Sequence, residues 1–254
     1  MTTLTRLDCG ELSGELSMFE AGADGRVTLS VSAWLVRHPR GTVLFDTGMP
    51  ASFVDGSART RRISEFLTIG FSAENRVDAQ LEAYSQDPGR VDFVVVSHLH
   101  FDHVGGLSML PNATLVIQRR EWESGMAVAR DADTLHERKD YDLGHPVLLV
   151  DGEHDLFGDD AVLCLPTPGH TVGHQSLRVR LVTGQQVVLA SDCCYFARTL
   201  DSGALPTFGH DLEQQRRSLA RLRRLRDDGT TIIPGHDIDV VASMPRTLGA
   251  NQGT

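Results

Sequence analysis

Ser97-His98-Leu99-His100-Phe101-Asp102-His103-Val104-Gly105-Gly106 is the stretch of this sequence that decides the fold. It contains four side chains that can bind a metal ion, three histidines and one aspartate. Imidazole and carboxylate ligands together suit a borderline divalent metal, above all zinc, although cobalt, manganese and iron also fit. In an extended loop His98 and His100 point the same way, whereas Asp102 and His103 can turn towards a second position. The stretch therefore predicts two metal ions.

Three further polar residues follow apolar runs elsewhere in the chain and are candidates for the remaining ligands. They are His170 in Thr167-Pro168-Gly169-His170-Thr171, Asp192 after the run at 186–189, and His236 in Pro234-Gly235-His236-Asp237. His174 is a candidate for orienting a metal ligand through a hydrogen bond. The other histidines are predicted to be polar surface residues: His38, His136, His145, His154 and His210.

The metal-binding stretch belongs to a pattern of strands that end in polar loops. The β-branched run Val91–Val96 predicts a buried strand that leads directly into Ser97. Because the chain has no Gly/Ser linker or low-complexity tract, the simplest prediction is one domain over residues 1–254, with two layered sheets and helices outside. Hairpins are expected across 39–41 and 183–185, and helices at 77–84, 119–129 and 211–226.

Two segments leave their structure open. Residues 58–72 mix arginines with apolar side chains, and they predict either a mobile lid over a bound apolar chain or a loop packed on the core. The charged stretch 130–144 is a candidate cap over the site. A lid that also covered a neighbouring copy would be consistent with a homodimer, although the sequence carries no direct signature of oligomeric state.

The composition argues against several classes of protein. A formal charge of -10 disfavours nucleic-acid binding, because phosphate contacts require a basic surface. No apolar run approaches the roughly 18 residues of a membrane span, and the first 19 residues do not resemble a signal sequence. The four cysteines do not form a disulfide framework. We therefore expect free thiols and a cytoplasmic protein, with no membrane or nucleic-acid partner.

The stretch His98–His103 resembles the His-x-His-x-Asp-His motif of the metallo-β-lactamase superfamily, and Phe45–Gly48 resembles a second motif of that superfamily. This resemblance implies a four-layer αβ/βα sandwich. Within the superfamily, nearly the whole chain is most similar to the N-acyl homoserine lactonases, the quorum-quenching enzymes. The segments that carry this similarity are 46–50, 97–103, 118–122, 167–177 and 235–238.

The resemblance also implies a role for individual residues. Tyr195 would contact the substrate carbonyl, Phe101 would line the acyl-chain side of the pocket, and Asp46 would support the metal-binding loop. The ligands of one metal would be His98, His100 and His170, those of the other Asp102, His103 and His236, and the Asp192 carboxylate would bridge the two.

These residues fit the hydrolysis of a lactone. Two metals about 3.5–4 Å apart can supply a bridging hydroxide near neutral pH and polarise the carbonyl. Tyr195 can donate a hydrogen bond to the developing oxyanion, and Asp102 can pass a proton to the leaving alkoxide. The predicted function is therefore the ring opening of N-acyl homoserine lactones to N-acyl homoserines, with two divalent metal ions, most often zinc, as cofactors.

Competing functions share the fold. A lactonase for another ring, such as a pyridoxic-acid lactone, or another ester or thioester hydrolase would use the same ligands with a different pocket. Hydroxyacylglutathione hydrolases carry a helical domain after the last ligand, whereas only 18 residues follow His236. A β-lactamase would use a cysteine near Asp192, and Cys193 would point to the opposite face. An iron-dependent oxidoreductase is less favoured, because the flavin-linked type needs an appended flavin domain.

Overall fold

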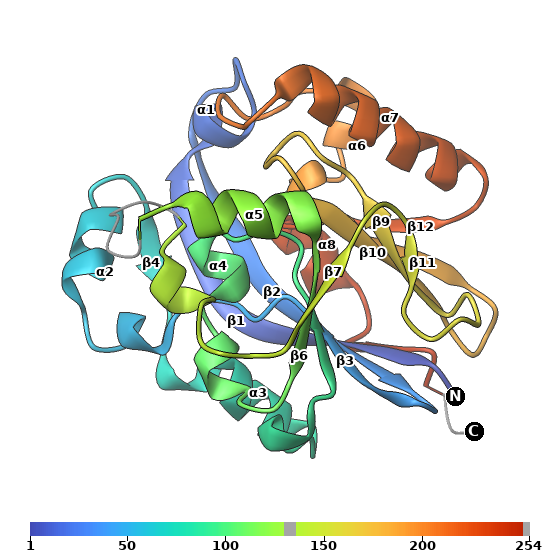
Figure 1. The fold of residues 1–254 in the computed structure, drawn as a ribbon. Helices are drawn as coiled ribbons and strands as arrows, with labels where there is room; N and C mark the ends of the chain where they lie inside the picture. Colours follow the sequence, from blue (N-terminus) through green and yellow to red (C-terminus); the bar gives the residue numbers. More distant parts are fainter. Residues whose placement is uncertain (130–135, 251–254) are drawn as a thin grey trace.

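The computed structural model describes residues 1–129 and 136–250, which form two facing β-sheets with helices on their outer sides (Figure 1). In the first sheet the strands follow the order β13-β1-β2-β3-β5-β6-β7, and β4 pairs with β1. β3, β5, β6 and β7 run parallel, and the other pairs are antiparallel. The strands are β1 (Thr3–Glu15), β2 (Arg26–His38), β3 (Gly41–Phe45), β4 (Thr68–Gly70), β5 (Phe93–Val95), β6 (Thr114–Gln118), β7 (Val147–Val150) and β13 (Thr247–Leu248).

The second sheet follows the order β12-β11-β10-β9-β8. All of its pairs are antiparallel except β11 with β12, which is parallel. Its strands are β8 (His154–Asp155), β9 (Val162–Pro166), β10 (Gln175–Arg180), β11 (Gln186–Leu189) and β12 (Thr231–Ile233).

Helices cover the outer face of each sheet. α3 packs on β1, α5 packs on β6 and β7, and α7 lies along the outer side of the second sheet beside β12 (Figure 1). No helix in the described ranges is long and apolar enough to cross a membrane. The helices are α1 (Leu16–Phe19), α2 (Ala58–Ile63), α3 (Val77–Ala83), α4 (Phe101–Val104), α5 (Arg119–Ala127), α6 (Thr199–Ser202), α7 (Leu212–Asp227) and α8 (Ile238–Ser243).

Alternation along the strands separates three apolar cores. In β2, Leu35 packs with the helices outside the first sheet, whereas Trp34 and Val36 face the second sheet. In β11, Leu189 belongs to the core between the sheets, and Val188 packs with the outer helices α6 and α7. Adjacent side chains of a strand point to opposite faces, so each sheet is buried on both sides. The fold is the expected αβ/βα sandwich.

The predicted hairpins and most predicted elements are confirmed, but the N-terminal strand β1 was not expected. Its alternation is broken by a bulge between Asp8 and Glu11, where Gly10 has a φ of 98°. Leu7 and Leu12 consequently face the same core although their sequence separation is odd. A bulge inserts one residue into the period of two, and this conceals the strand from a search for alternation.

Parallel strands bring the polar loops to one edge of the fold. β3 and β5 are parallel, and Asp46 and Ser97 follow their carboxyl ends. β11 and β12 are also parallel, and Asp192 and His236 follow them. The four loop entries therefore meet where the two sheets face each other.

Part of residues 58–72 is packed on the rest of the molecule. α2 opens the segment, and β4 pairs with β1. The Arg59 side chain is only 5% exposed, forms ion pairs with Glu137 at 3.0 Å and Asp140 at 2.5 Å, and lies over the Phe101 ring. These contacts match the packed-loop alternative at α2, and the mobile lid remains a prediction. Of the stretch expected to form a cap, residues 130–135 lie outside the described residues.

We expect Arg59→Leu to lower the free energy of unfolding by about 3–5 kcal/mol, because it removes the buried cation that pairs with two buried carboxylates. Denaturant titration of the metal-depleted protein measures this change. Arg61→Leu, an exposed arginine of the same helix, is the matched control and should change stability by no more than about 0.5 kcal/mol. Equal stability of the two variants would show that the buried ion pairs contribute nothing.

Candidate metal centre

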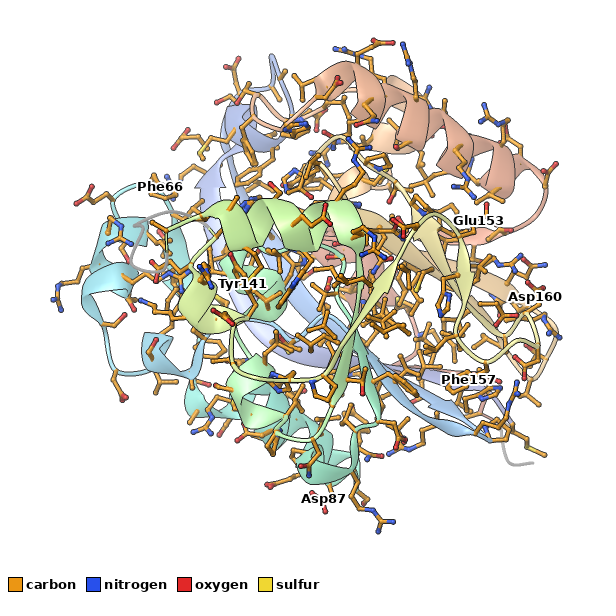
Figure 2. The ribbon with its side chains drawn as sticks, in the orientation of Figure 1. Phe66, Asp87, Tyr141, Glu153, Phe157 and Asp160 are labelled. Carbon is orange, nitrogen blue, oxygen red and sulfur yellow. The ribbon has the colours of Figure 1, made fainter. Side chains whose placement is uncertain are left out.

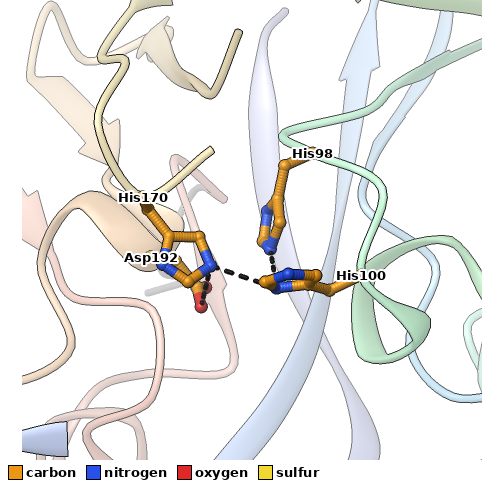
Figure 3. A group of neighbouring side chains, drawn as sticks. All are labelled: His98, His100, His170 and Asp192. Atoms are coloured by element: carbon orange, nitrogen blue, oxygen red, sulfur yellow. Dashed lines mark hydrogen bonds and ion pairs between the residues drawn. The ribbon is translucent and has the colours of Figure 1, made fainter. Parts of the chain in front are cut away.

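Two groups of histidine and carboxylate side chains lie at the edge where the sheets meet. Within each group the potential ligand atoms all lie within 4.8 Å of one another. Figure 3 shows His98 and His100 approaching His170 and Asp192 from opposite sides. The first group is His98, His100, His170 and Asp192, and the second is Asp102, His103 and His236.

The first group is held by direct contacts between its rings. His100 Nδ1 lies 2.9 Å from His98 Nε2 and 3.1 Å from His170 Nε2. His170 Nε2 is in turn 3.3 Å from Asp192 Oδ2. Three imidazoles and one carboxylate thus converge on a space small enough for a single ion.

Asp192 also contacts the second group, through its other oxygen. Asp192 Oδ1 lies 3.1 Å from His103 Nε2 and 3.0 Å from His236 Nε2. Asp102 Oδ2 is 3.5 Å from the same His103 nitrogen. Because each oxygen of Asp192 faces a different group, this carboxylate occupies the position expected of a bridging ligand.

The histidines of the first group have free lone pairs at neutral pH. Burial, together with repulsion from neighbouring histidines, lowers the pKa of His98 and His100 well below 6.5. Burial lowers the pKa of His170 to about 4. Neutral imidazole is the form that binds a metal, so these residues fit the role.

In the second group, the histidines are protonated more readily because carboxylates surround them. Burial opposes a charge on His103, but Asp102, Asp192 and Asp46 outweigh it and raise the pKa of His103 well above 6.5. Burial would likewise raise the pKa of Asp192, yet the surrounding histidines, His236 first, hold it well below 3.8. A divalent cation supplies the same compensation as these protons and replaces them when it binds. The donor set therefore fits divalent metal ions in both groups.

Asp46 fixes the loop that carries most of the ligands. Its carboxylate accepts hydrogen bonds from the backbone N–H and the hydroxyl of Ser97, both at 2.8 Å, and lies 2.8 Å from His103 Nδ1. Asp46 itself has a φ of 58° and Ser191, next to Asp192, has a φ of 47°. Left-handed backbone is unusual for these residue types, and here it turns the chain out of a strand and into the site.

The glycines of the quoted stretch allow a close approach of the next loop. A Cβ atom at Gly106 would lie 2.3 Å from the carbonyl oxygen of Thr47, and one at Gly105 would lie 2.3 Å from Pro50 N. The Thr47 backbone N–H donates to the carbonyl oxygen of His103 at 2.7 Å. Only glycine fits at these two positions, so the loop after Asp46 can pack directly against the loop that carries the candidate ligands.

Tyr195 and Phe101 lie beside the candidate ligands. The Tyr195 hydroxyl donates to Asp192 Oδ2 at 2.6 Å, and its ring lies 5.1 Å from that of His236. Phe101 is buried and its ring packs 5.5 Å from Phe53. Both side chains line a pocket that opens onto the ligands.

His174 and the cysteines are placed differently from the ligands. His174 Nδ1 hydrogen bonds with Thr167 Oγ1 at 2.9 Å, and its ring packs 5.2 Å from His98. Within the described residues it thus supports His98 through packing, whereas a hydrogen bond to a ligand was expected. Cys193 packs in the outer core beneath α7, and burial raises the pKa of its thiol well above 9. Asp192, and not Cys193, faces the other ligands.

Some residues of the site were missed by the sequence analysis. The prediction that His136 is a surface residue was wrong: it is half-buried, with its ring 4.4 Å from that of His100. The same prediction was wrong for His38, which lies outside the site: its side chain is only 4% exposed and pairs with Asp159 at 3.1 Å. Glu121, in the first turn of α5, is a buried carboxylate beside two ligand loops. Contacts across the fold place these three residues, and no local pattern signals them.

Two unlike pockets meet at the ligands, and His100 and Phe208 line both. One has a volume of about 270 Å³ and a wall of mixed polarity that includes Glu121 and His136. The other, of about 300 Å³, is apolar beyond the ligands themselves. Its apolar wall consists of Leu12, Met18, Phe19, Leu29, Phe66, Leu67, Phe101, Tyr195 and Phe208.

Comparisons with known proteins agree with this geometry. Residues 26–236 match the model of the metallo-beta-lactamase superfamily. The N-acyl homoserine lactonase AttM of Azorhizobium caulinodans is 32% identical over 237 residues, covering 90% of this chain and 89% of the relative. The N-acyl homoserine lactonase AiiA of Bacillus thuringiensis subsp. kurstaki is 30% identical, covering 84% and 83%.

A solved structure gives the same relationship. It is an N-acyl homoserine lactone hydrolase with the product N-hexanoyl-L-homoserine bound at the catalytic metal centre, and it is 26% identical to this chain. The two superpose with a TM-score of 0.84 over 96% of each chain. The chain therefore belongs to the metallo-beta-lactamase superfamily and, within it, to the family of the N-acyl homoserine lactonases.

Proposed function

We propose that this protein hydrolyses the lactone ring of N-acyl homoserine lactones and releases N-acyl homoserines. The observation that carries the proposal is a complete set of seven metal-binding side chains that opens onto an apolar pocket. The relatives named above support the choice of this substrate class. Degradation of such lactones would quench signalling between bacteria.

We infer that two divalent cations, most often zinc, are the cofactors. His98, His100 and His170 would hold one ion, Asp102, His103 and His236 would hold the other, and Asp192 would bridge them. Bound together, the two ions would lower the pKa of a water molecule and polarise the lactone carbonyl. Imidazole and carboxylate donors favour zinc, and they also accept cobalt, manganese or iron.

Tyr195 would stabilise the oxyanion. Burial, with the neighbouring Asp192 carboxylate, raises the pKa of Tyr195 well above 10, so its hydroxyl keeps the proton that it must donate. The hydroxyl lies in the apolar pocket close to the ligands, where hydrogen bonds to developing charge are strong.

Asp102 would transfer the proton from the attacking water to the leaving group. Burial raises and His103 lowers the pKa of Asp102, and the net effect keeps the carboxylate ionised at neutral pH. Asp102 lines the apolar pocket and can take the proton released by the attacking water. Delivery of that proton to the departing ring oxygen completes the reaction.

The apolar pocket would hold the acyl chain. Phe101 and Leu67 form its buried wall, and Phe66, at 45% exposure, lies at its rim next to α2 (Figure 2). Burying each methylene of a chain is worth about 0.8 kcal/mol, so this surface would discriminate between acyl lengths.

The organisation and location of the protein follow the same proposal. Residues 1–254 would act as one hydrolase domain, since the terminal strand β13 pairs with β1 in the first sheet. The four cysteines are free and buried, which supports a cytoplasmic location. The homodimer remains a prediction.

The proposed function is tested by product analysis with a panel of butanoyl and decanoyl homoserine lactones, γ-butyrolactone and a thioester. We expect the zinc-loaded protein to add one water to the homoserine lactones, with a preference for one chain length. Treatment with a chelator should abolish the reaction, and zinc should restore it. A metal-loaded protein that opens no lactone would refute the proposal.

Tyr195→Phe should lower kcat for the homoserine lactones by about 10- to 1000-fold, because it removes one donor to the oxyanion. Tyr84→Phe is the control. Tyr84 lines neither pocket, so this variant should keep the wild-type kcat. Steady-state kinetics at equal metal content measure both. An unchanged kcat would assign Tyr195 to packing alone.

Phe66→Ala should raise KM for the decanoyl substrate by several-fold and leave KM for the butanoyl substrate nearly unchanged, because the rim contacts only a long chain. Val54→Ala is the matched control, since Val54 is also exposed (39%) and does not line the apolar pocket. An equal effect on both substrates would place the acyl chain elsewhere.

A further inference from the structure

A buried carboxylate outside the proposed ligand set joins two of the ligand loops. Glu121 is only 2% exposed. Its Oε1 accepts a hydrogen bond from the backbone N–H of Leu99 at 3.2 Å, and its Oε2 accepts one from the backbone N–H of Gly173 at 2.9 Å. Each carboxylate oxygen therefore holds a different loop.

The two loops carry the three histidines of the first group. Leu99 lies between His98 and His100 after β5 of the first sheet, and Gly173 follows His170 in the loop between β9 and β10 of the second. His100 Nδ1 lies 3.1 Å from His170 Nε2. The distance between the loops thus sets the size of the first metal site.

The packing of α5 makes room for this double contact. A Cβ atom at Gly173 would lie 2.4 Å from Glu121 N, and one at Gly125 would lie 2.2 Å from Leu99 Cδ1. Glu121 and Gly125 are the buried residues of α5 and are one turn apart on the same face. Glycine at both close contacts lets the helix reach the two loops.

A neutral side chain would not make the same pair of contacts. Two backbone N–H donors point at Glu121, and an ionised carboxylate offers an acceptor to each. Glutamine has the same shape but one acceptor, so its amide N–H₂ would face a donor. The first turn of α5 also favours a negative charge, because the amino end of a helix is positive.

We propose that Glu121 is a positioning residue that clamps the His98–His100 loop to the His170 loop and so sets the affinity of the first metal site. The inference rests on the metal centre of the proposed function and does not depend on the identity of the substrate. Glu121 acts through the backbone of the two loops and touches no reacting atom.

The test is the zinc affinity of each site in Glu121→Gln, measured by competition with chelators of graded strength. We expect one of the two zinc ions to bind roughly 10- to 100-fold more weakly, as when a supporting partner of a metal ligand is removed, while the other changes by less than about threefold. Glu123→Gln is the matched control, since Glu123 is exposed on the same helix. It should bind both ions as the wild type does.

Thermal unfolding with and without zinc separates positioning from general stability. Positioning predicts a smaller rise in Tm on zinc binding for Glu121→Gln than for the wild type. An equal rise, with unchanged affinities, would overturn the inference and leave the proposed function intact. A wild-type protein that does not bind two zinc ions would overturn both.

Glu121→Asp provides a second variant if glutamine prevents folding. It keeps the charge and both acceptor oxygens on a shorter side chain. We expect a weaker loss of affinity in the same direction and for the same single ion. Wild-type affinity at both sites in this variant, with Glu121→Gln unfolded, would also overturn the inference.

Discussion

The Asp192 carboxylate is the contact on which the site depends. It follows β11 of the second sheet, yet its two oxygens face His103 from the first sheet and His170 and His236 from the second. A carboxylate buried this deeply is costly unless cations or donors surround it. The loops of both sheets must therefore be in place before the Asp192 carboxylate is compensated. This couples the folding of this edge to the assembly of the metal centre.

The loops reach this arrangement through local backbone strain that side chains compensate. Asp46 and Ser191 adopt left-handed backbone at the points where the chain leaves a strand. Such conformations cost on the order of 1–3 kcal/mol each. Asp46 offsets this cost by accepting two hydrogen bonds from Ser97 and by contacting His103. The strain thus lies where the ligand loops begin and serves to aim them.

The surroundings of the metal centre suit a substrate with two unlike ends. A pocket of mixed polarity and an apolar pocket share His100 and Phe208, so a molecule held at the ligands would extend into both. Phe66 and Leu67, from residues 58–72, form part of the apolar wall. The guanidinium of the buried Arg59, in the same segment, lies over the Phe101 ring. The contacts of Arg59 therefore stabilise the segment that contributes to the apolar wall and also contact the stretch that carries the candidate ligands.

The sequence alone determined the fold class and was enough to predict the candidate ligand set, because both depend on short-range patterns. His98–His103 carries four donors in one loop, and the alternation of β2 and β3 marks a hairpin. The sequence did not predict β1, because a bulge breaks the alternation of its side chains. Only the tertiary structure decided which oxygen of Asp192 faces which histidines, that the His136 ring packs edge-on against His100, and that Glu121 holds two loops. These contacts join residues that are distant in sequence, and their energies depend on burial and separation, which no local pattern encodes.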